Sequence, residues 1–307
     1  MPASVPAFFI KSRENMTPAK QSLIQINIAV ILFGGTTLFS KLISLPASNI
    51  TCFRAAIGCV ALALFVLLRR ESFRLQNRQE YFWMIVIGLV MGMHWVSFFH
   101  SMQISTVAIG IVSMFTFPVM TALIEPLVDK VRYRLSDFIC AFAVLGGIIL
   151  IVPEFSVEND VAMGLVWGCL AAAGLTARNI IVRKKLKHVS SIVCMWYQLV
   201  VTFLMLSPFI SYEYDLLEDN RLLYLALLGV FFTAIPHSLI VASLKNLRAT
   251  TVSLISCTQP FYSIVIAAIA IGEIPEVKVI IGGVIIIASA LYESVKATKE
   301  PDQLQEV

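Results

Sequence analysis

Residues 97–129 read SFFHSMQISTVAIGIVSMFTFPVMTALIEPLVD, a long apolar run with Pro118 near its middle. Residues 239–271 read LIVASLKNLRATTVSLISCTQPFYSIVIAAIAI and have the same construction. A shift of the chain against itself by 142 residues superposes Ser101 on Ser243 and Pro118 on Pro260. Apolar helices that are interrupted in corresponding places of two halves indicate where a transporter binds its solute. The two stretches therefore predict two repeats around a central binding site.

The composition is that of an integral membrane protein. Hydrophobic residues make up 58% of the 307 residues, charged residues 14%, and the mean hydropathy is +0.86. A soluble domain carries about 25% charged residues. Apolar runs of about 20 residues, long enough to cross a bilayer, occur at 24–44, 49–68, 81–101, 104–124, 135–152, 162–182, 191–210, 222–243, 249–270 and 277–295. The alternation of an outer-membrane strand is absent, so we expect an all-α integral membrane fold of ten transmembrane helices.

Basic residues predict the orientation of these helices. Eighteen of the 23 Lys and Arg residues fall in segments that face one side, at 11–20, 69–78, 130–134, 183–187, 245–248 and 296–299. The positive-inside rule predicts that this side and both termini are cytoplasmic. The ten spans and the 142-residue shift make two units of five spans. Because five is odd, the second unit starts on the opposite side of the membrane from the first, so we expect two inverted five-helix repeats. The expected divisions are a cytoplasmic tail at 1–21, repeats at 22–153 and 161–296, and a cytoplasmic tail at 297–307.

Several classes of function are disfavoured. No P-loop motif is present, which excludes ATP hydrolysis by this chain. The six cysteines all lie inside predicted spans without metal-type spacing, as buried small hydrophobic residues do. The net charge of +4 indicates topology rather than a nucleic-acid partner. No metal site, cofactor or nucleic-acid partner is predicted.

Four stretches together resemble the drug/metabolite transporter superfamily, in the version with two EamA domains. They are FGGTTLFSKLISLPASNITCFRAAIG at 33–58, SMQISTVAIGIVSMFTFPVMTALIEPL at 101–127, RNIIVRKK at 178–185 and SLKNLRATTVSLISCTQPFYSIVIAAIAIGEIP at 243–275. The resemblance covers about residues 22–296 and implies a cavity between the halves, lined by helices one, three, four, six, eight and nine. One departure is that Val131 stands where the first repeat would match the closing Glu273 of the second.

Polar and proline residues inside the spans are candidates for function, because polar groups are expensive in a membrane. Those expected to bind the solute are His94, Trp95, Ser113, Met114, Pro118, Asn179, His237, Gln259 and Pro260. His237 aligns with Trp95 under the repeat shift, so His94 and His237 lie in near-equivalent places. They could hydrogen-bond a solute or accept a proton near neutral pH; the alternative is hydrogen bonding between helices. Apolar cavity walls are expected from Trp95, Met114, Phe115, Phe117, Phe232 and Tyr262.

Two further residues are candidates for coupling or gating. Arg54 lies about 7 Å inside the second span, where it could fix neighbouring helix ends or attract an anionic solute. Glu125 could carry protons, pair with a basic residue or reach cytoplasmic water. Arg178, about one turn inside the sixth span, is expected to extend to the cytoplasmic face.

These observations favour a secondary transporter that exports small organic metabolites, such as amino acids, by alternating access. The expected location is the cell (inner or plasma) membrane, and the expected partners are a small-molecule solute and the lipid bilayer. Proton coupling stays open. One alternative is an exchanger of nucleoside-type or nucleotide-type solutes, for which more basic cavity residues would be expected. Another is an intramembrane enzyme, which the lack of carboxylate pairs and of H-E-x-x-H disfavours.

Overall fold

A computed structural model describes residues 17–36, 39, 42–151, 160–210, 216–262, 265–266 and 277–299, apart from the side chains of residues 107 and 108. All regular structure in these ranges is helical. Most of the two tails expected at 1–21 and 297–307 lies outside the described residues, as does Glu273.

The helices of the first half are α2 (Pro18–Gly34), α4 (Ala47–Leu68), α5 (Arg78–Ile104), α6 (Val107–Met114), α7 (Phe117–Asp129) and α8 (Leu135–Ile151). Those of the second half are α9 (Val161–Lys185), α10 (Ser191–Leu206), α11 (Arg221–Gly229), α12 (Ile235–Ser243), α13 (Ala249–Ser256) and α15 (Val277–Lys299). Three short turns are η1 (Ser207–Phe209), η2 (Glu218–Asn220) and η3 (Val230–Ala234). Each of the ten predicted spans overlaps one or more of these helices, and parts of the spans at 24–44 and 249–270 lie outside the described residues.

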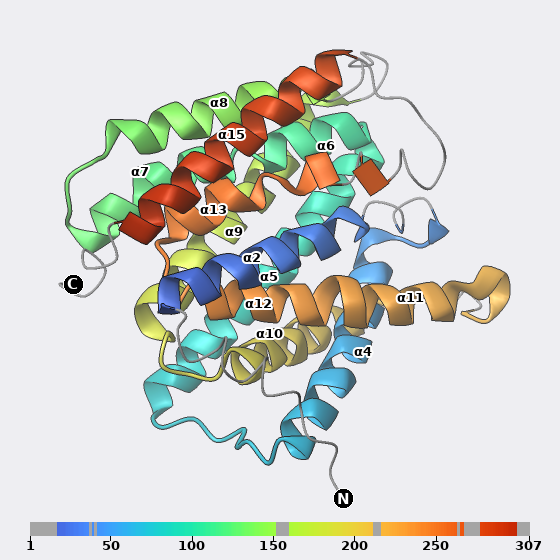
Figure 1. The fold of residues 1–307 in the computed structure, drawn as a ribbon. Helices are drawn as coiled ribbons and strands as arrows, with labels where there is room; N and C mark the ends of the chain where they lie inside the picture. The colour runs from blue at the N-terminus through green and yellow to red at the C-terminus, as the bar shows by residue number, and fades with distance from the viewer. Residues whose placement is uncertain are drawn as a thin grey trace, which may run out of the picture.

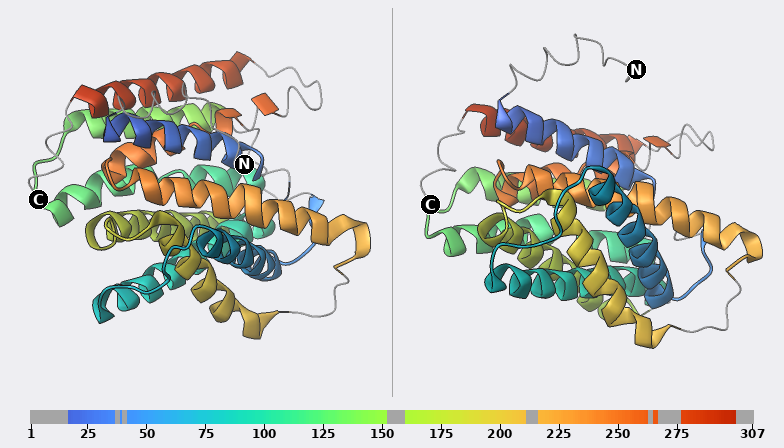
Figure 2. Two further views of the ribbon diagram at one scale, coloured as in Figure 1. Left: turned by 60° about the horizontal axis from the view of Figure 1, so that its bottom comes forward. Right: turned by 90° about the horizontal axis from the view of Figure 1, so that it is seen from below.

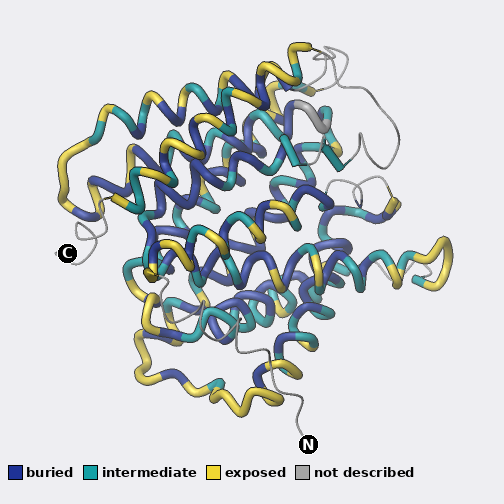
Figure 3. Tube along the Cα trace, in the orientation of Figure 1, coloured by how far each residue is buried: buried dark blue, intermediate teal, exposed yellow. Residues whose placement is uncertain are grey.

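The exterior of the bundle is apolar. Val60, Ile139 and Val284 are 60%, 60% and 62% exposed, and exposed positions follow the outer faces of the helices while the buried ones lie inside (Figure 3). Within the described ranges, seven helical segments are long and apolar enough to cross a membrane. An apolar exterior over long helices fits a lipid surround, which confirms the predicted all-α membrane fold.

Helix packing repeats between the two halves. α4 packs on α10 and α8 packs on α15, and each pair joins corresponding helices of the halves. α2 packs on α12, and the corresponding helices α9 and α5 also pack together. In Figure 1, α8 and α15 run side by side along one edge, and α2 and α12 run side by side through the middle; Figure 2 shows the same layers from two other sides. The contacts are thus related by a pseudo-two-fold axis, as two inverted repeats require.

Polar residues set where several helices begin. Thr17, Asn77, Thr106 and Asp160 each accept a hydrogen bond from a backbone N–H of the first helical turn, which satisfies a donor that has no partner within its helix. Asn77 also donates its amide to the carboxylate of Glu80, which makes a reciprocal cap. Because Thr17 caps α2, this helix begins at Pro18 instead of at residue 24.

The two proline-centred stretches break at corresponding positions. Two residues separate the end of α6 from the start of α7, and Pro118 lies in the first turn of α7. α13 ends at Ser256, and helix resumes at Gln259 and Pro260. Every boundary of the second break lies 142 residues after its counterpart in the first. Proline has no N–H to donate to the preceding turn, so both helices restart at the proline.

Candidate functional site

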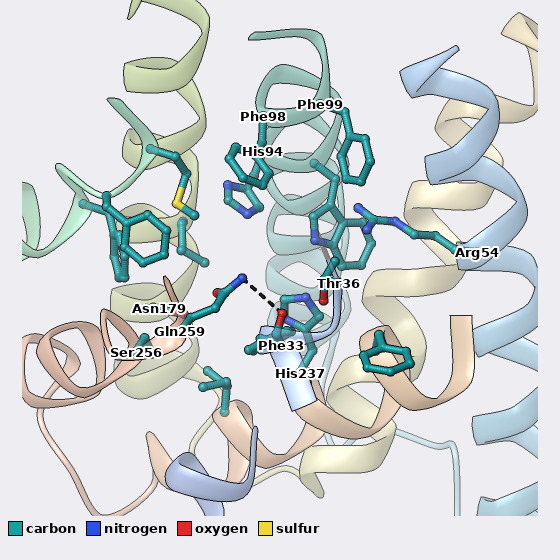
Figure 4. A pocket seen from close by; sticks show the side chains of 17 residues that line it. Phe33, Thr36, Arg54, His94, Phe98, Phe99, Asn179, His237, Ser256 and Gln259 are labelled. Carbon is teal, nitrogen blue, oxygen red and sulfur yellow. Dashed lines mark hydrogen bonds between the residues drawn. The ribbon is translucent and has the colours of Figure 1, made fainter. Parts of the chain in front are cut away.

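A cavity of about 80 Å³ lies beside the two helix breaks, among α2, α4, α5, α6, α7, α9, η3, α12 and α13 (Figure 4). It is lined by seventeen residues, most of them aromatic or aliphatic: Phe33, Thr36, Arg54, His94, Trp95, Phe98, Phe99, Met114, Phe115, Phe117, Leu175, Asn179, Phe232, His237, Ile240, Ser256 and Gln259. Pockets for drug-sized ligands measure roughly 300–1,000 Å³. In this conformation the cavity therefore fits only a small solute.

The cavity walls obey the repeat symmetry. Five pairs of lining residues are 142 residues apart: Phe33 and Leu175, Trp95 and His237, Phe98 and Ile240, Met114 and Ser256, and Phe117 and Gln259. Each repeat thus contributes the same positions of its helices to the wall. This places the cavity at the interface between the repeats, where inverted-repeat transporters hold their substrates.

Seven of the candidate residues from the sequence line this cavity, namely Arg54, His94, Trp95, Met114, Asn179, His237 and Gln259. Ser113, Pro118 and Pro260 do not. Ser113 instead donates to the carbonyl of Ile109 one turn earlier in its own helix and packs where α6 meets Gly168 of α9. The prolines set the helix breaks, and their neighbours Phe117 and Gln259 supply the wall.

His94 is held in one orientation by α9. Its Nδ1 lies 2.7 Å from the carbonyl oxygen of Ala171. A carbonyl can only accept, so Nδ1 carries the proton, and in the neutral ring Nε2 is an acceptor. Figure 4 shows the ring among the lining side chains, above Asn179 and beside Phe98. His94 therefore offers the cavity an oriented hydrogen-bond acceptor.

His237 is held by aromatic rings. The ring centroids of Phe33 and Trp95 lie 4.7 Å and 5.1 Å from that of His237, both in edge-to-face arrangements. The residue follows Pro236, and the wide turn η3 comes just before it. Pro236 cannot donate to the preceding turn, which explains the widened helix there. This local opening brings both Phe232 and His237 to the cavity.

Arg54 is a buried cation without a counter-ion in the described part of the chain. It is 2% exposed, and neither its Nε nor its Nη2 has a hydrogen-bond partner there. Its Cζ lies 4.5 Å from the ring centroid of Trp95 and 5.0 Å from that of Phe99. An arginine at the centre of a membrane helix costs roughly 2.5–3.5 kcal/mol or more, and a desolvated cation–π contact returns about 2 kcal/mol. The rings therefore offset only part of the cost.

Arg178 is also buried, but polar side chains surround it. Its Nε donates to Gln198 at 2.8 Å and its Nη1 to the Asn179 side-chain oxygen at 2.9 Å. The residue is fully buried, so the expectation that it extends to the cytoplasmic face is wrong. Gln198 lies on α10, and its side-chain oxygen accepts the hydrogen bond from Arg178 Nε in place of water. By binding Asn179, Arg178 orients that side chain at the cavity wall.

Gln259 ties the second helix break to α2. Its Nε2 donates to the carbonyl of Phe33 at 3.3 Å, the dashed line in Figure 4. This bond spans the two repeats, because Phe33 belongs to the first and Gln259 to the second. The polar groups at the cavity wall therefore also join the halves.

Glu125 lies outside the cavity and joins the repeats a second time. Its Oε1 accepts from the backbone N–H of Ala249, and its Oε2 accepts from the N–H and the hydroxyl of Thr250, at 2.6, 2.8 and 2.6 Å. Arg183 and Arg248 approach the carboxylate to 3.2 and 3.7 Å. The start of α13 has no cap from its own residue Arg248. Glu125 of α7 thus caps the N-terminus of α13 from the other repeat.

The same charges extend to α8 and α15. Arg248 donates to Asp137 at 2.9 Å, and Lys296 pairs with Asp137, while Arg183 binds Asp129 at 2.6 Å. Burial alone would lower the pKa of Arg248, but the carboxylates of Glu125 and Asp137 outweigh it and raise the pKa. Arg248 therefore stays charged at the centre of the network. We call Glu125, Asp129, Asp137, Arg183, Arg248 and Lys296 the charged network.

Tyr262 does not line the cavity, whereas Phe33, Thr36, Phe98, Phe99, Leu175, Ile240 and Ser256 do, although none of these was a candidate wall residue from the sequence. An apolar side chain in a membrane helix gives no sign by itself of whether it faces lipid, protein or a cavity. The repeat shift could have found Ser256, since it aligns Ser256 with the candidate Met114. Among the described residues, no group of three or more metal-ligating side chains comes together.

Comparison with known proteins gives the family. Residues 21–152 and 162–293 each match the EamA-like transporter family. A Bacillus subtilis protein, the uncharacterized transporter YxxF, is 24% identical over 286 residues, which cover 91% of this chain and 90% of that protein. Solute carrier family 35 member G1 of Mus musculus is 24% identical over 187 residues, which cover 57% of this chain and 50% of that protein. One solved crystal structure shares the fold, with a TM-score of 0.75 and 16% identity over 93% of this chain and 99% of the other.

The two matched segments correspond to the two halves that pack with pseudo-two-fold symmetry around the cavity. The relatives are transporters rather than enzymes, and the family is the one that the four sequence stretches resemble. This chain belongs to the EamA-like transporter family, within the drug/metabolite transporter superfamily.

Proposed function

We propose that this protein moves a small organic metabolite across the membrane through the central cavity, by exposing the cavity to the two sides in turn. The observation that carries the proposal is the cavity wall itself. Five pairs of symmetry-related residues from the two repeats line it. Because the cavity lies between the repeats, a movement of one repeat against the other can close the cavity to one side of the membrane and open it to the other.

The chemistry of the wall supports a solute with an apolar body and a few polar groups. Phe98, Phe115 and Phe232 supply rings, while His94, Asn179 and Gln259 supply oriented polar groups. Cavities for small organic ligands combine a mostly apolar lining with few polar contacts in the same way. Amino acids and related metabolites have this character. A nucleotide-type solute, for which more basic wall residues are expected, is disfavoured because Arg54 is the one Lys or Arg among the described lining residues.

The charged network supports the alternation of access. It joins α7 of the first repeat to α13 of the second beyond the cavity, so it holds one end of the path closed in this conformation. In the proposed cycle the Glu125 cap is broken, α7 and α13 separate, and the cavity opens at that end. The basic residues at this end favour the cytoplasm as the side it faces, and the family resemblance favours export from a cell membrane.

Solute counterflow in proteoliposomes tests the proposal, with labelled amino acids, small carboxylic acids and nucleosides as the panel. We expect at least one small metabolite to exchange across the membrane. Ser256→Trp should abolish that exchange, because the new ring fills a cavity of about 80 Å³. Ser72→Trp is the matched control, since Ser72 is exposed in the segment between α4 and α5, away from the cavity wall. Equal counterflow by both variants would contradict the central cavity as the path.

Counterflow in the two vesicle orientations tests the direction. In inside-out vesicles an exporter accumulates solute from the bath, and in right-side-out vesicles it depletes the preloaded interior. The opposite pattern under a physiological gradient would show import.

A further inference from the structure

We propose that the cavity recognises a carboxylate on its solute, and that Arg54 binds this group. The inference rests on the proposed function of the cavity and names the class of solute: small carboxylates with an apolar or aromatic body. Arg54 comes from α4, and in Figure 4 its side chain extends toward the aromatic rings at the edge of the cavity.

The first argument is that the Arg54 guanidinium has donors but no acceptor. Arg54 is 2% exposed and lines the cavity. Its Nε and Nη2 are enclosed without a hydrogen-bond partner in the described ranges, and no carboxylate lies within salt-bridge distance of it there. Trp95 and Phe99 stabilise the charge from 4.5 and 5.0 Å, but a ring face cannot replace an in-plane acceptor for the N–H groups. The donors are thus available to a ligand.

The second argument is the contrast with the other arginines inside the bundle. Arg178 donates to Gln198 and Asn179, while Arg183 and Arg248 bind carboxylates of the charged network. A structural arginine in this protein therefore has polar partners of its own, although Nη2 of Arg178 has none among the described residues. Arg54 has none among the described residues, although it would need carbonyl or carboxylate acceptors to fix neighbouring helix ends.

The third argument is charge balance. Arg54 is the one charged residue among those that line the cavity in the described part of the chain. The described wall thus carries a positive charge that no other lining residue compensates, in a surround of low dielectric constant. A single carboxylate neutralises it and fits the guanidinium fork with two parallel hydrogen bonds. A doubly charged phosphate would leave one negative charge unmatched.

The rest of the wall suits the remainder of such a solute. Phe98 and Phe232 can pack against an apolar body. His94 Nε2 can accept from an amine or hydroxyl group of the solute, because Nδ1 is already bound to Ala171. An amino acid and an aryl-substituted carboxylic acid both have this arrangement of groups.

Matched acid and amide probes test the proposal on the purified full-length protein. The probes are phenylacetate against phenylacetamide, 3-phenylpropionate against 3-phenylpropionamide, and L-phenylalanine against its amide, with phenyl phosphate as a fourth anion. Within each of the first two pairs the shape is nearly the same and the charge differs. The shift of the thermal unfolding midpoint with probe concentration gives the apparent affinity, because a ligand that binds only the folded state stabilises it.

We expect the acids to bind roughly tenfold to a hundredfold more tightly than their amides, as a charge-assisted hydrogen-bond pair implies. Arg54→Gln should remove this preference. Arg69→Gln is the matched control and should keep it. Arg69 directly follows α4, and its Cζ lies 5.4 Å from the ring centroid of Phe65, but the residue is exposed. If Arg54→Gln fails to fold, the acid–amide comparison on the wild-type protein still decides.

Three outcomes would overturn the proposal: equal binding of acids and amides by the wild-type protein, an acid preference that survives in Arg54→Gln, or binding of phenyl phosphate in place of the acids. The test is separate from the transport assay. Acids that bind without any counterflow would contradict the proposed function and leave the carboxylate site standing. Counterflow of neutral solutes only, with no preference for acids, would support the proposed transport function and contradict the carboxylate site.

Discussion

Replacement of Glu125 by Gln should open the end of the transport path that the charged network closes. The carboxylate accepts three hydrogen bonds of 2.6–2.8 Å from the first residues of α13 and is fully buried. A glutamine amide presents an NH₂ group to donors that need an acceptor. It also leaves Arg183 and Arg248 with one fewer negative charge.

The size of the effect follows from these contacts. Removing one partner of a buried charge pair costs about 3–5 kcal/mol. If about 3 kcal/mol of this falls on the closed form alone, the ratio of open to closed molecules rises roughly 150-fold. A single substitution is therefore enough to populate an open form that is rare in the wild-type protein.

Cysteine labelling measures this opening. Ser253 is buried on α13 and donates to Thr121 of α7 at 3.2 Å, so a cysteine in its place reacts with a thiol reagent only when these helices separate. We expect the labelling rate of Ser253→Cys to rise about a hundredfold when Glu125→Gln is added.

Glu293→Gln is the matched control for this assay. Glu293 is a buried carboxylate near the same network, but it accepts from Thr251 and lies near Lys296, both within the second repeat. Its loss removes a negative charge without breaking a bond between the repeats. Equal labelling rates in the Glu125→Gln and Glu293→Gln backgrounds would refute the argument that the cap of α13 holds the repeats together.

Three further predictions concern packing, the histidines and topology. A Cβ on Gly282 would lie 2.4 Å from a backbone oxygen of α8, so Gly282→Ala should destabilise the protein by about 1–3 kcal/mol. Gly146→Ala in α8, whose Cβ would meet nothing within 4 Å, should not lower the thermal unfolding midpoint. His94→Ala and His237→Ala should each lower counterflow per folded molecule. Wild-type rates in both variants would show that these histidines serve helix packing and not solute binding. A cysteine at Asp160 should react with an impermeant reagent from the outside only; labelling from the inside alone would reverse the topology.

The sequence was sufficient for the architecture because the architecture depends on local patterns. Apolar runs of about 20 residues locate the spans, and Pro118 and Pro260 locate the two breaks because proline cannot continue a helix. The polar candidates His94, Asn179 and Gln259 could be named because an unneeded polar group in a membrane helix is costly.

The sequence was not sufficient for contacts between distant segments. Gln198 lies one helix away from Arg178, and no local pattern indicates that it would satisfy that arginine inside the membrane. The partner of Glu125 is the backbone of residues 249 and 250, which lies in the other repeat, and backbone donors leave no sequence signal. Other apolar wall residues, such as Phe98 and Leu175, were missed for a different reason, since lipid-facing and cavity-facing side chains have the same composition.

The most direct test of the account is a reversible cross-link between the repeats. Thr121 and Ser253 lie between the cavity and the charged network, with their hydroxyl oxygens 3.2 Å apart, so cysteines at both positions, in a cysteine-free background that transports, can form a disulfide. The account predicts that oxidation stops counterflow of the transported metabolite and that reduction restores it, while each single-cysteine variant is unaffected. Undiminished counterflow by fully cross-linked protein would contradict the claim that α7 and α13 separate to open the cavity.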